Sequence, residues 1–100
     1  LDIADYTKVI EINPNDAQAI YRRGVAFLQQ KDITKAMPDF TKAIEIDPNY
    51  AGAYNNRGTA NYFVKEYDKA WADVHKVEGL GYAVHPEFLK ELKKASGRDK

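Results

Sequence analysis

Apolar residues recur along the chain at the three- and four-residue spacing of amphipathic helices, in segments separated by short polar breaks. Pro14 and Pro48 each end one of these segments, and Gly79-Leu80-Gly81 ends another. Proline and glycine are expected where one helix stops and the next begins in a new direction. The pattern therefore predicts an all-α fold with helices at about 2–12, 17–30, 33–47, 51–64, 67–79 and 86–97.

The helical segments also repeat with a period of 34 residues, which is typical of stacked helix hairpins. Chance does not produce matches at so many positions in one register. The recurring positions are Pro14 and Pro48, Asn15 and Asn49, Arg23-Gly24 and Arg57-Gly58, Ala26 and Ala60, Ala36 and Ala70, and Asp39 and Asp73.

Glycine recurs in the middle of two predicted helices, at Gly24 and Gly58, where it costs about 1 kcal/mol relative to alanine. A close approach of two helices would explain this cost, with Ala36 and Ala70 as the small residues opposite. Aromatic residues then fill the remaining space between the paired helices, and we expect Phe27, Phe40, Tyr54 and Trp71 to do so.

The segment 17–50 contains Ile20-x2-Arg23-Gly24-x2-Phe27, then Ala36-x3-Phe40, Ala43 and Pro48, and it resembles a complete tetratricopeptide repeat. Segment 51–84 resembles a second, more divergent repeat, with Tyr82 in place of the closing proline. Segment 1–16 resembles the second helix and closing turn of a preceding repeat, and segment 85–100 a capping helix and tail. The resemblance implies one domain over 1–100, in which antiparallel helix-turn-helix repeats stack as a right-handed superhelical solenoid with a C-terminal capping helix.

Individual residues indicate where several of these helices begin, bend or pack. Asp32 and Glu66 open the second helix of each repeat, and each follows a lysine where the family usually has glycine. Pro38 lies in the second turn of its predicted helix and is expected to bend or loosen that turn. Near the C-terminus, Pro86 suits a first helical turn. The apolar stripe of the capping helix consists of Phe88, Leu89, Leu92 and Ala95.

The first helix presents an apolar stripe that its own repeat leaves uncovered, formed by Ile3, Tyr6, Val9 and Ile10. Leaving this surface in water would forgo several kcal/mol at about 25 cal/mol per Å². The chain starts at Leu1 without a methionine, already inside a helical pattern, which suggests a fragment. We therefore expect either upstream residues or a partner chain to pack there. Self-association through residues 2–12 is the alternative role, that of a structural or assembly module.

Composition excludes several function classes. Lys plus Arg equals Asp plus Glu at 15 each, so no overall field favours nucleic acid or an anionic membrane. No apolar run has the length of a membrane span, and the absence of cysteine leaves the compartment open. The chain has one serine, Ser96, and two histidines, His75 and His85, and it lacks a glycine-rich phosphate loop. We therefore expect no enzyme, no metal site and no cofactor.

The resemblance implies a binding scaffold, because first helices of such repeats line a concave groove that generally binds peptides or proteins. A solvated helix face is the alternative for the same side chains. The expected partner is a peptide or protein segment, with an acidic or C-terminal carboxylate feature suited to arginine and lysine. The residues expected to line the groove are Gln18, Tyr21, Arg22, Val25, Gln29, Asn55, Asn56, Thr59, Tyr62 and Phe63, with Lys90 and Lys93 from the capping helix.

Some family members hold a C-terminal carboxylate in a clamp of asparagine, lysine and arginine. Asn56 and Arg22 resemble two clamp positions, but their order is reversed and Gln18 stands where a clamp lysine would be. A looser preference for acidic peptides is the expectation here. Arg23 and Arg57, by contrast, are each followed at the same separation by Asp39 and Asp73, which indicates ion pairs within the scaffold rather than ligand contacts.

Overall fold

The computed structural model describes residues 1–100 and contains six α-helices and no strand. The predicted all-α class is confirmed, and every helix begins and ends within one residue of its predicted bounds. The helices are α1 (Ile3–Ile12), α2 (Ala17–Gln29), α3 (Ile33–Ile46), α4 (Ala51–Phe63), α5 (Tyr67–Gly79) and α6 (Pro86–Ser96). None of them combines the length and the apolar content needed to cross a membrane.

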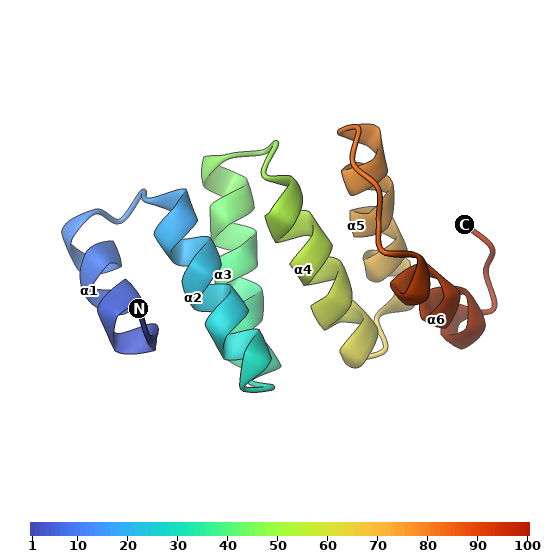
Figure 1. Ribbon diagram of the computed structural model, residues 1–100, viewed down its shortest axis with the longest axis horizontal. Helices are drawn as coiled ribbons and strands as arrows, with labels where there is room; N and C mark the ends of the chain where they lie inside the picture. Colours follow the sequence, from blue (N-terminus) through green and yellow to red (C-terminus); the bar gives the residue numbers. More distant parts are fainter.

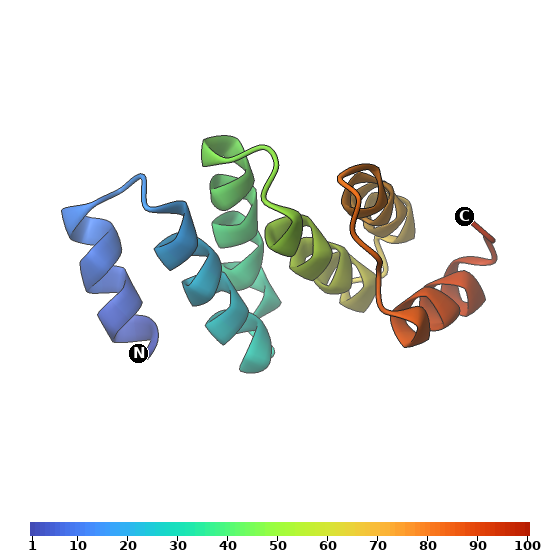
Figure 2. The ribbon, with the colours of Figure 1, turned by 45° about the horizontal axis from the view of Figure 1, so that its top comes forward.

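The helices stack in sequence order into an elongated solenoid of 43 × 26 × 18 Å, with the two termini at opposite ends (Figure 1). Helices α2 and α3 form one antiparallel hairpin and α4 and α5 form the next, while α1 packs against α2 and α6 against α5. Figure 2 shows that α6 lies obliquely across the C-terminal end of the array. Contacts therefore run mainly between neighbours, and α2 also touches α4.

The mid-helix glycines mark the closest approach within each hairpin, as predicted. A Cβ atom on Gly24 would lie 2.9 Å from Cε1 of Phe40 and 3.1 Å from Cβ of Asp39. A Cβ atom on Gly58 would lie 3.3 Å from Cβ of Asp73. Both glycines are buried, so the loss of helix propensity is offset by tight packing of the two helices.

Three of the four predicted core aromatics are enclosed between helices, namely Phe40, Tyr54 and Trp71. Phe27 is different, because it is only half-buried. The guanidinium carbon of Arg23 lies 6.0 Å from the centre of the Phe27 ring, and the ammonium of Lys35 lies 5.8 Å from it. Two cationic side chains therefore lie near this half-buried ring.

The turn inside each hairpin places a lysine in the left-handed region, with φ of 62° at Lys31 and 64° at Lys65. This conformation explains why glycine would suit both positions. Asp32 then begins α3 as predicted, and its carboxylate accepts a hydrogen bond of 3.2 Å from the backbone N–H of Lys35. Glu66 begins α5 but forms no such bond, so only its charge favours the helix start.

Helix α3 continues without a break through Pro38, so the proline does not interrupt the helix. The proline ring is exposed to solvent, while Asp39 and Phe40 beside it are buried in the hairpin. The packing of these neighbours holds the helix together across the one backbone hydrogen bond that proline cannot form.

Helix α6 closes the C-terminal end through Leu92, which is fully buried against the core of the second hairpin. Phe88 and Leu89 are half-buried beside it, whereas Ala95 is exposed and does not belong to the packed stripe. Trp71 of α5 donates a hydrogen bond of 3.0 Å from Nε1 to the hydroxyl oxygen of Ser96. The far end of α6 is thereby tied to the start of α5.

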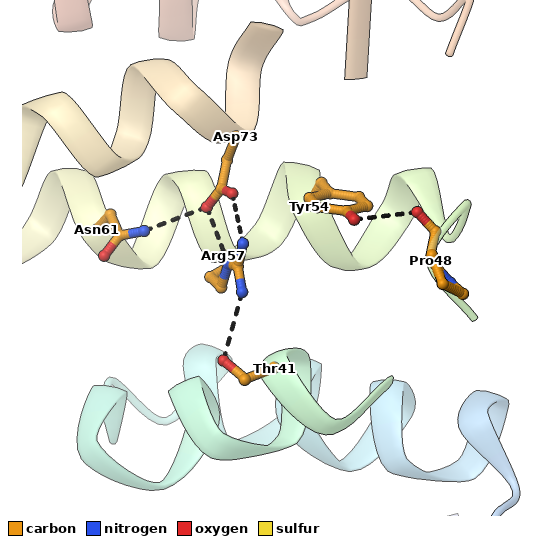
Figure 3. Close-up of polar contacts among 6 residues, drawn as sticks. All are labelled: Thr41, Pro48, Tyr54, Arg57, Asn61 and Asp73. Carbon is orange, nitrogen blue, oxygen red and sulfur yellow. Dashed lines mark hydrogen bonds and ion pairs between the residues drawn. The ribbon is translucent and has the colours of Figure 1, made fainter. Parts of the chain in front are cut away.

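Each hairpin contains the predicted arginine–aspartate ion pair. Arg23 donates from Nε and Nη2 to the two carboxylate oxygens of Asp39, at 2.9 and 2.8 Å. Arg57 binds Asp73 in the same way, at 3.1 and 2.8 Å (Figure 3). The hydrogen bonds to aspartate raise the pKa of both guanidinium groups above the ordinary arginine value. These two arginines belong to the scaffold, since their donors are committed to buried carboxylates.

Candidate functional site

Side chains from the two hairpins meet at the junction of α2 and α4. The ring of Tyr21 on α2 lies 4.8 Å, centre to centre, from that of Tyr50, which directly precedes α4. The Tyr21 hydroxyl accepts a hydrogen bond of 2.9 Å from Nδ2 of Asn56 on α4. The same Nδ2 donates to the carbonyl oxygen of Gly52, at 3.1 Å. Together these contacts fix the ring of Tyr21 across the boundary between the hairpins.

The hydrogen bonds also determine which polar groups of this junction remain available. The carbonyl oxygen of Gly52 can only accept, so the amide nitrogen of Asn56 must face it. The amide oxygen of Asn56 accepts no hydrogen bond within the protein. Burial raises the pKa of Tyr21, while the Asn56 hydrogen bond and the charge of Arg22 oppose this effect more weakly. The phenol therefore keeps its proton at neutral pH and can donate it to a ligand.

A glycine makes room for this arrangement. A Cβ atom on Gly52 would lie 3.1 Å from the hydroxyl oxygen of Tyr21 and 3.2 Å from its Cζ. One repeat earlier, the equivalent position is Gln18, which is exposed on α2. A side chain at position 52 would require the Tyr21 ring to shift by a few tenths of an ångström.

An open depression lies along α2, and it gathers five of the predicted groove residues. Tyr21 and Tyr50 stand at one side of it, and Arg22 is exposed and forms no ion pair within the protein. No carboxylate lines this depression. Its lining residues are Leu1, Tyr6, Gln18, Tyr21, Arg22, Val25, Ala26, Gln29 and Tyr50.

A second, larger depression lies between the start of α4 and the segment before α6. Tyr50 lines both depressions, so they adjoin at this residue. Asp47 adds a carboxylate here, which makes this end less favourable than the Arg22 end for an acidic group. The lining residues are Asp47, Asn49, Tyr50, Ala51, Gly52, Asn55, Val77, Tyr82, Ala83 and His85. We call the combined surface, from Gln18 and Arg22 on α2 to Asn55 and Asn56 on α4, the α2–α4 face.

Other predicted groove residues lie in different surroundings. The Thr59 hydroxyl donates to the backbone oxygen of Asn55, at 3.2 Å. Tyr62 packs edge-on against Phe88 of α6, with ring centres 5.6 Å apart, and so helps to attach the capping helix. Phe63 is exposed and lines a separate apolar depression with Leu28, Lys31 and Ile33.

Lys90 and Lys93 are exposed on α6 and line neither depression of the α2–α4 face. They form no ion pair within the protein. Their charges therefore act on this face only from its edge, through solvent.

Sequence reasoning found only Asn55 among the residues that line the second depression, and it missed the three ring side chains there: Tyr50, Tyr82 and His85. Tyr50 and His85 directly precede helices, and His85 accepts a hydrogen bond of 3.2 Å at Nδ1 from the backbone N–H of Glu87. Tyr82 is 61% exposed although it is a large aromatic residue. Its place in the repeat could have revealed it, because the position that carries Pro48 in the preceding repeat carries an exposed tyrosine here.

Comparison with known proteins gives one consistent family. Two models of the tetratricopeptide repeat match the sequence, one over residues 17–50 and the other over residues 40–72. A search of curated proteins found no matching sequence.

Solved structures similar to this chain include several such domains. The first domain of Spaghetti (RPAP3), bound to the HSP90 peptide SRMEEVD, is 27% identical with a TM-score of 0.84, over 95% of this chain and 75% of that one. The second domain of human RPAP3, in complex with the HSP70 peptide SGPTIEEVD, is 29% identical with a TM-score of 0.82, over 96% and 79%. The domain of Arabidopsis OM64 is 32% identical with a TM-score of 0.76, over 96% and 75%.

Proposed function

Because this chain belongs to the tetratricopeptide repeat family, we propose that its α2–α4 face binds an extended peptide with an acidic or free carboxylate end. The role is binding alone, and no catalytic step is assigned to any residue. The observation that carries the proposal is the exposed, unpaired guanidinium of Arg22 beside the donor hydroxyl of Tyr21, in a depression without a carboxylate.

Each polar group of the junction has a distinct part in this proposal. Arg22 would pair with a ligand carboxylate, and the Tyr21 hydroxyl would donate a further hydrogen bond to it. The amide oxygen of Asn56 would accept from a backbone N–H of the peptide, and the exposed Asn55 can serve either backbone group. Tyr50 and Tyr82 would supply rigid contact area on either side.

Two relatives support an acidic ligand, because each is bound to a peptide that ends in EEVD. The arrangement of Asn56 nonetheless argues against a full carboxylate clamp. Its amide donors are already used on Tyr21 and Gly52, so it would not donate to a terminal carboxylate. A looser preference for acidic peptides, centred on Arg22, fits these contacts better. Lys90 and Lys93 would contribute long-range attraction from α6.

The test is a titration of the chain with the peptide SRMEEVD, in one form with a free C-terminus and in another with an amidated one. We expect Arg22→Ala to weaken binding about tenfold, the equivalent of about 1.4 kcal/mol, because a charge-assisted hydrogen bond is lost. Tyr21→Phe should weaken binding about two- to fivefold, since it removes one neutral donor and leaves the ring packing. Isothermal titration calorimetry measures both, and amide chemical shifts locate the site.

The matched control is Lys42→Ala, which removes another exposed cation, from α3. Its affinity for the peptide should stay within about twofold of the parent, because long-range attraction is largely screened by salt. If Lys42→Ala weakened binding as much as Arg22→Ala, or if the shifted amides lay outside α2 and α4, the α2–α4 face would not be the binding site.

A further inference from the structure

A further depression opens between α3, α4 and α5, outside the α2–α4 face. Its volume is about 310 Å³, and it shares no lining residue with either depression of that face. This volume is at the lower end of the range for small-molecule sites, so it suits a single ring rather than a larger ligand. We call it the Asn61 depression, and its lining includes Met37, Thr41, Arg57, Asn61, Lys69 and Asp73.

Four of these lining residues recur unchanged in the first hairpin, 34 residues earlier. The recurring pairs are Thr7 and Thr41, Arg23 and Arg57, Lys35 and Lys69, and Asp39 and Asp73. Asn61 is different, because Phe27 has its place in the first hairpin. The half-buried Phe27 ring has its centre 5.8 Å from the ammonium nitrogen of Lys35. The second hairpin therefore keeps the cation that faces this ring but has no ring at that position.

The amide of Asn61 is bound within the protein at only one end, although the residue is 3% exposed. Its Nδ2 donates to the carboxylate of Asp73 at 3.2 Å, and because a carboxylate only accepts, the amide oxygen must point away from it (Figure 3). This oxygen accepts no hydrogen bond from the protein. Every fully buried side-chain nitrogen or oxygen has a partner, so Oδ1 of Asn61 is not fully enclosed and opens to the depression.

Two cations line the depression, and Lys69 is the one that remains available. Arg57 is bound to both carboxylate oxygens of Asp73, and its guanidinium carbon lies 5.6 Å from the ring centre of Tyr54. Lys69 is exposed and forms no ion pair within the protein. Because its equivalent Lys35 faces Phe27, Lys69 can reach a ring at the corresponding point.

The lining favours a neutral aromatic group with a hydrogen-bond donor over an anion. Asp73 brings a carboxylate and Asn61 presents an acceptor oxygen, and both disfavour a negative ligand. A phenol suits the same groups, since its ring attracts the Lys69 ammonium and its hydroxyl can donate to the amide oxygen. The half-buried thioether of Met37 adds a favourable contact for a ring.

We infer that the Asn61 depression receives the side chain of a tyrosine from a partner protein. The ring would lie between Met37 and Lys69, close to the place that Phe27 fills in the first hairpin. Its hydroxyl would donate to Oδ1 of Asn61. Phenylalanine would fit less well, because it would cover the amide oxygen without giving it a donor. The depression shares no residue with the α2–α4 face, so both surfaces can be occupied at the same time.

The probe is p-cresol, which is the tyrosine side chain without its backbone, and toluene is the matched compound without the hydroxyl. Met37 is the one methionine of the sequence, so its methyl resonance reports on the depression without overlap. We expect p-cresol to shift this resonance and the side-chain amide of Asn61 in a saturable way, with the millimolar dissociation constant that so small a ligand allows. Toluene should bind about fivefold more weakly, since it makes no hydrogen bond.

Variants of the lining residues test the assignment. Asn61→Phe gives the second hairpin the residue of the first and should abolish the p-cresol shift at Met37. We expect this variant to fold, because Asp39 in the first hairpin is bound by its arginine beside a phenylalanine. Lys69→Gln should weaken p-cresol binding about two- to fivefold. The matched control is Lys42→Gln, an exposed lysine of α3 outside the depression, which should leave binding unchanged.

Four results would overturn the inference. One is that p-cresol gives no saturable shift at Met37, and another is that Asn61→Phe, folded by circular dichroism, binds it as tightly as the parent. A third is that inorganic phosphate shifts the same resonances and displaces p-cresol, which would make the depression an anion site. The fourth is equal affinity for toluene, which would show that the hydroxyl is not recognised and that the assignment to tyrosine is wrong.

Discussion

At the residue scale, Gly24 and Gly58 both allow the two helices of a hairpin to approach closely, but the space around them differs. The position of Gly24 faces an aromatic ring and a Cβ atom at 2.9 and 3.1 Å, whereas Gly58 faces the Cβ atom of Asp73 at 3.3 Å. The 2.9 Å distance at Gly24 is too short for a real methyl group, whereas the 3.3 Å distance at Gly58 requires a shift of only a few tenths of an ångström. The same glycine in the same repeat position is therefore required to different degrees.

We accordingly predict that alanine is tolerated at Gly58 but not at Gly24. Gly24→Ala should destabilise the fold by up to about 2 kcal/mol, since overpacking costs about 1–3 kcal/mol and the improved helix propensity offsets about 1 kcal/mol of this. Gly58→Ala should stay within about 0.5 kcal/mol of the parent, because the two effects nearly cancel there. Urea unfolding at equal protein concentration measures both. Equal losses at the two sites would show that the spacing of the helices does not set the tolerance.

At the element scale, the arginine–aspartate pair holds together the two helices of each hairpin. The carboxylates of Asp39 and Asp73 are almost completely buried, so each depends on its arginine for compensation. The raised pKa of each arginine means that the pair stabilises fully below the ordinary arginine pKa and loses this contribution only as pH rises through the folded value. Its contribution is therefore constant throughout the neutral range.

The two arginine–aspartate pairs differ in one neighbouring side chain that donates to the carboxylate. Nδ2 of Asn61 donates to Asp73 at 3.2 Å, whereas the equivalent position in the first hairpin is Phe27 (Figure 3). We expect Arg23→Ala to cost about 3 kcal/mol or more, because Asp39 is left buried without a donor.

Arg57→Ala should cost about 1 kcal/mol less than Arg23→Ala, since Asn61 still serves Asp73. Thermal and urea unfolding report the two losses, and Asn61→Leu in the Arg57→Ala background should remove the advantage. Equal costs for the two arginines, with or without Asn61, would mean that this amide does not compensate the carboxylate.

At the scale of the whole molecule, the array is nearly one-dimensional, because most contacts join neighbouring helices. Stability in such arrays is distributed locally, so the ends can open without unfolding the centre. Helix α6 depends on one fully buried side chain, Leu92, on the contact between Phe88 and Tyr62, and on the hydrogen bond from Trp71 to Ser96.

We predict that Leu92→Ala releases α6 while leaving the first hairpin folded. Loss of a buried leucine costs about 2–5 kcal/mol, and here the cost should fall on the attachment of α6. Hydrogen exchange should accelerate in residues 86–96 and at Tyr62, with little change in α2 and α3. Uniform acceleration across all six helices would show that the chain unfolds as a single cooperative unit.

Most of the fold could be predicted from the sequence, because the information is local and is repeated. Helix bounds follow from the apolar spacing with proline and glycine at the ends, and the recurrence of arginine before glycine with a later aspartate predicts the paired hairpin. Pro38 is the exception. Its effect depends on the burial of the two residues that follow it, which the local pattern does not reveal.

The candidate site was less predictable, because it depends on contacts between repeats. The sequence by itself determined the helices, their pairing and the small residues between them, since each depends on spacing within one period. Only the tertiary structure decided that Tyr21 lies against Tyr50 and that the Asn56 amide donates its hydrogen bonds to Tyr21 and Gly52. It also decided that Tyr62 packs against α6. Side-chain orientation across a helix junction is set by the angle between the hairpins, and no periodicity in a single chain encodes that angle.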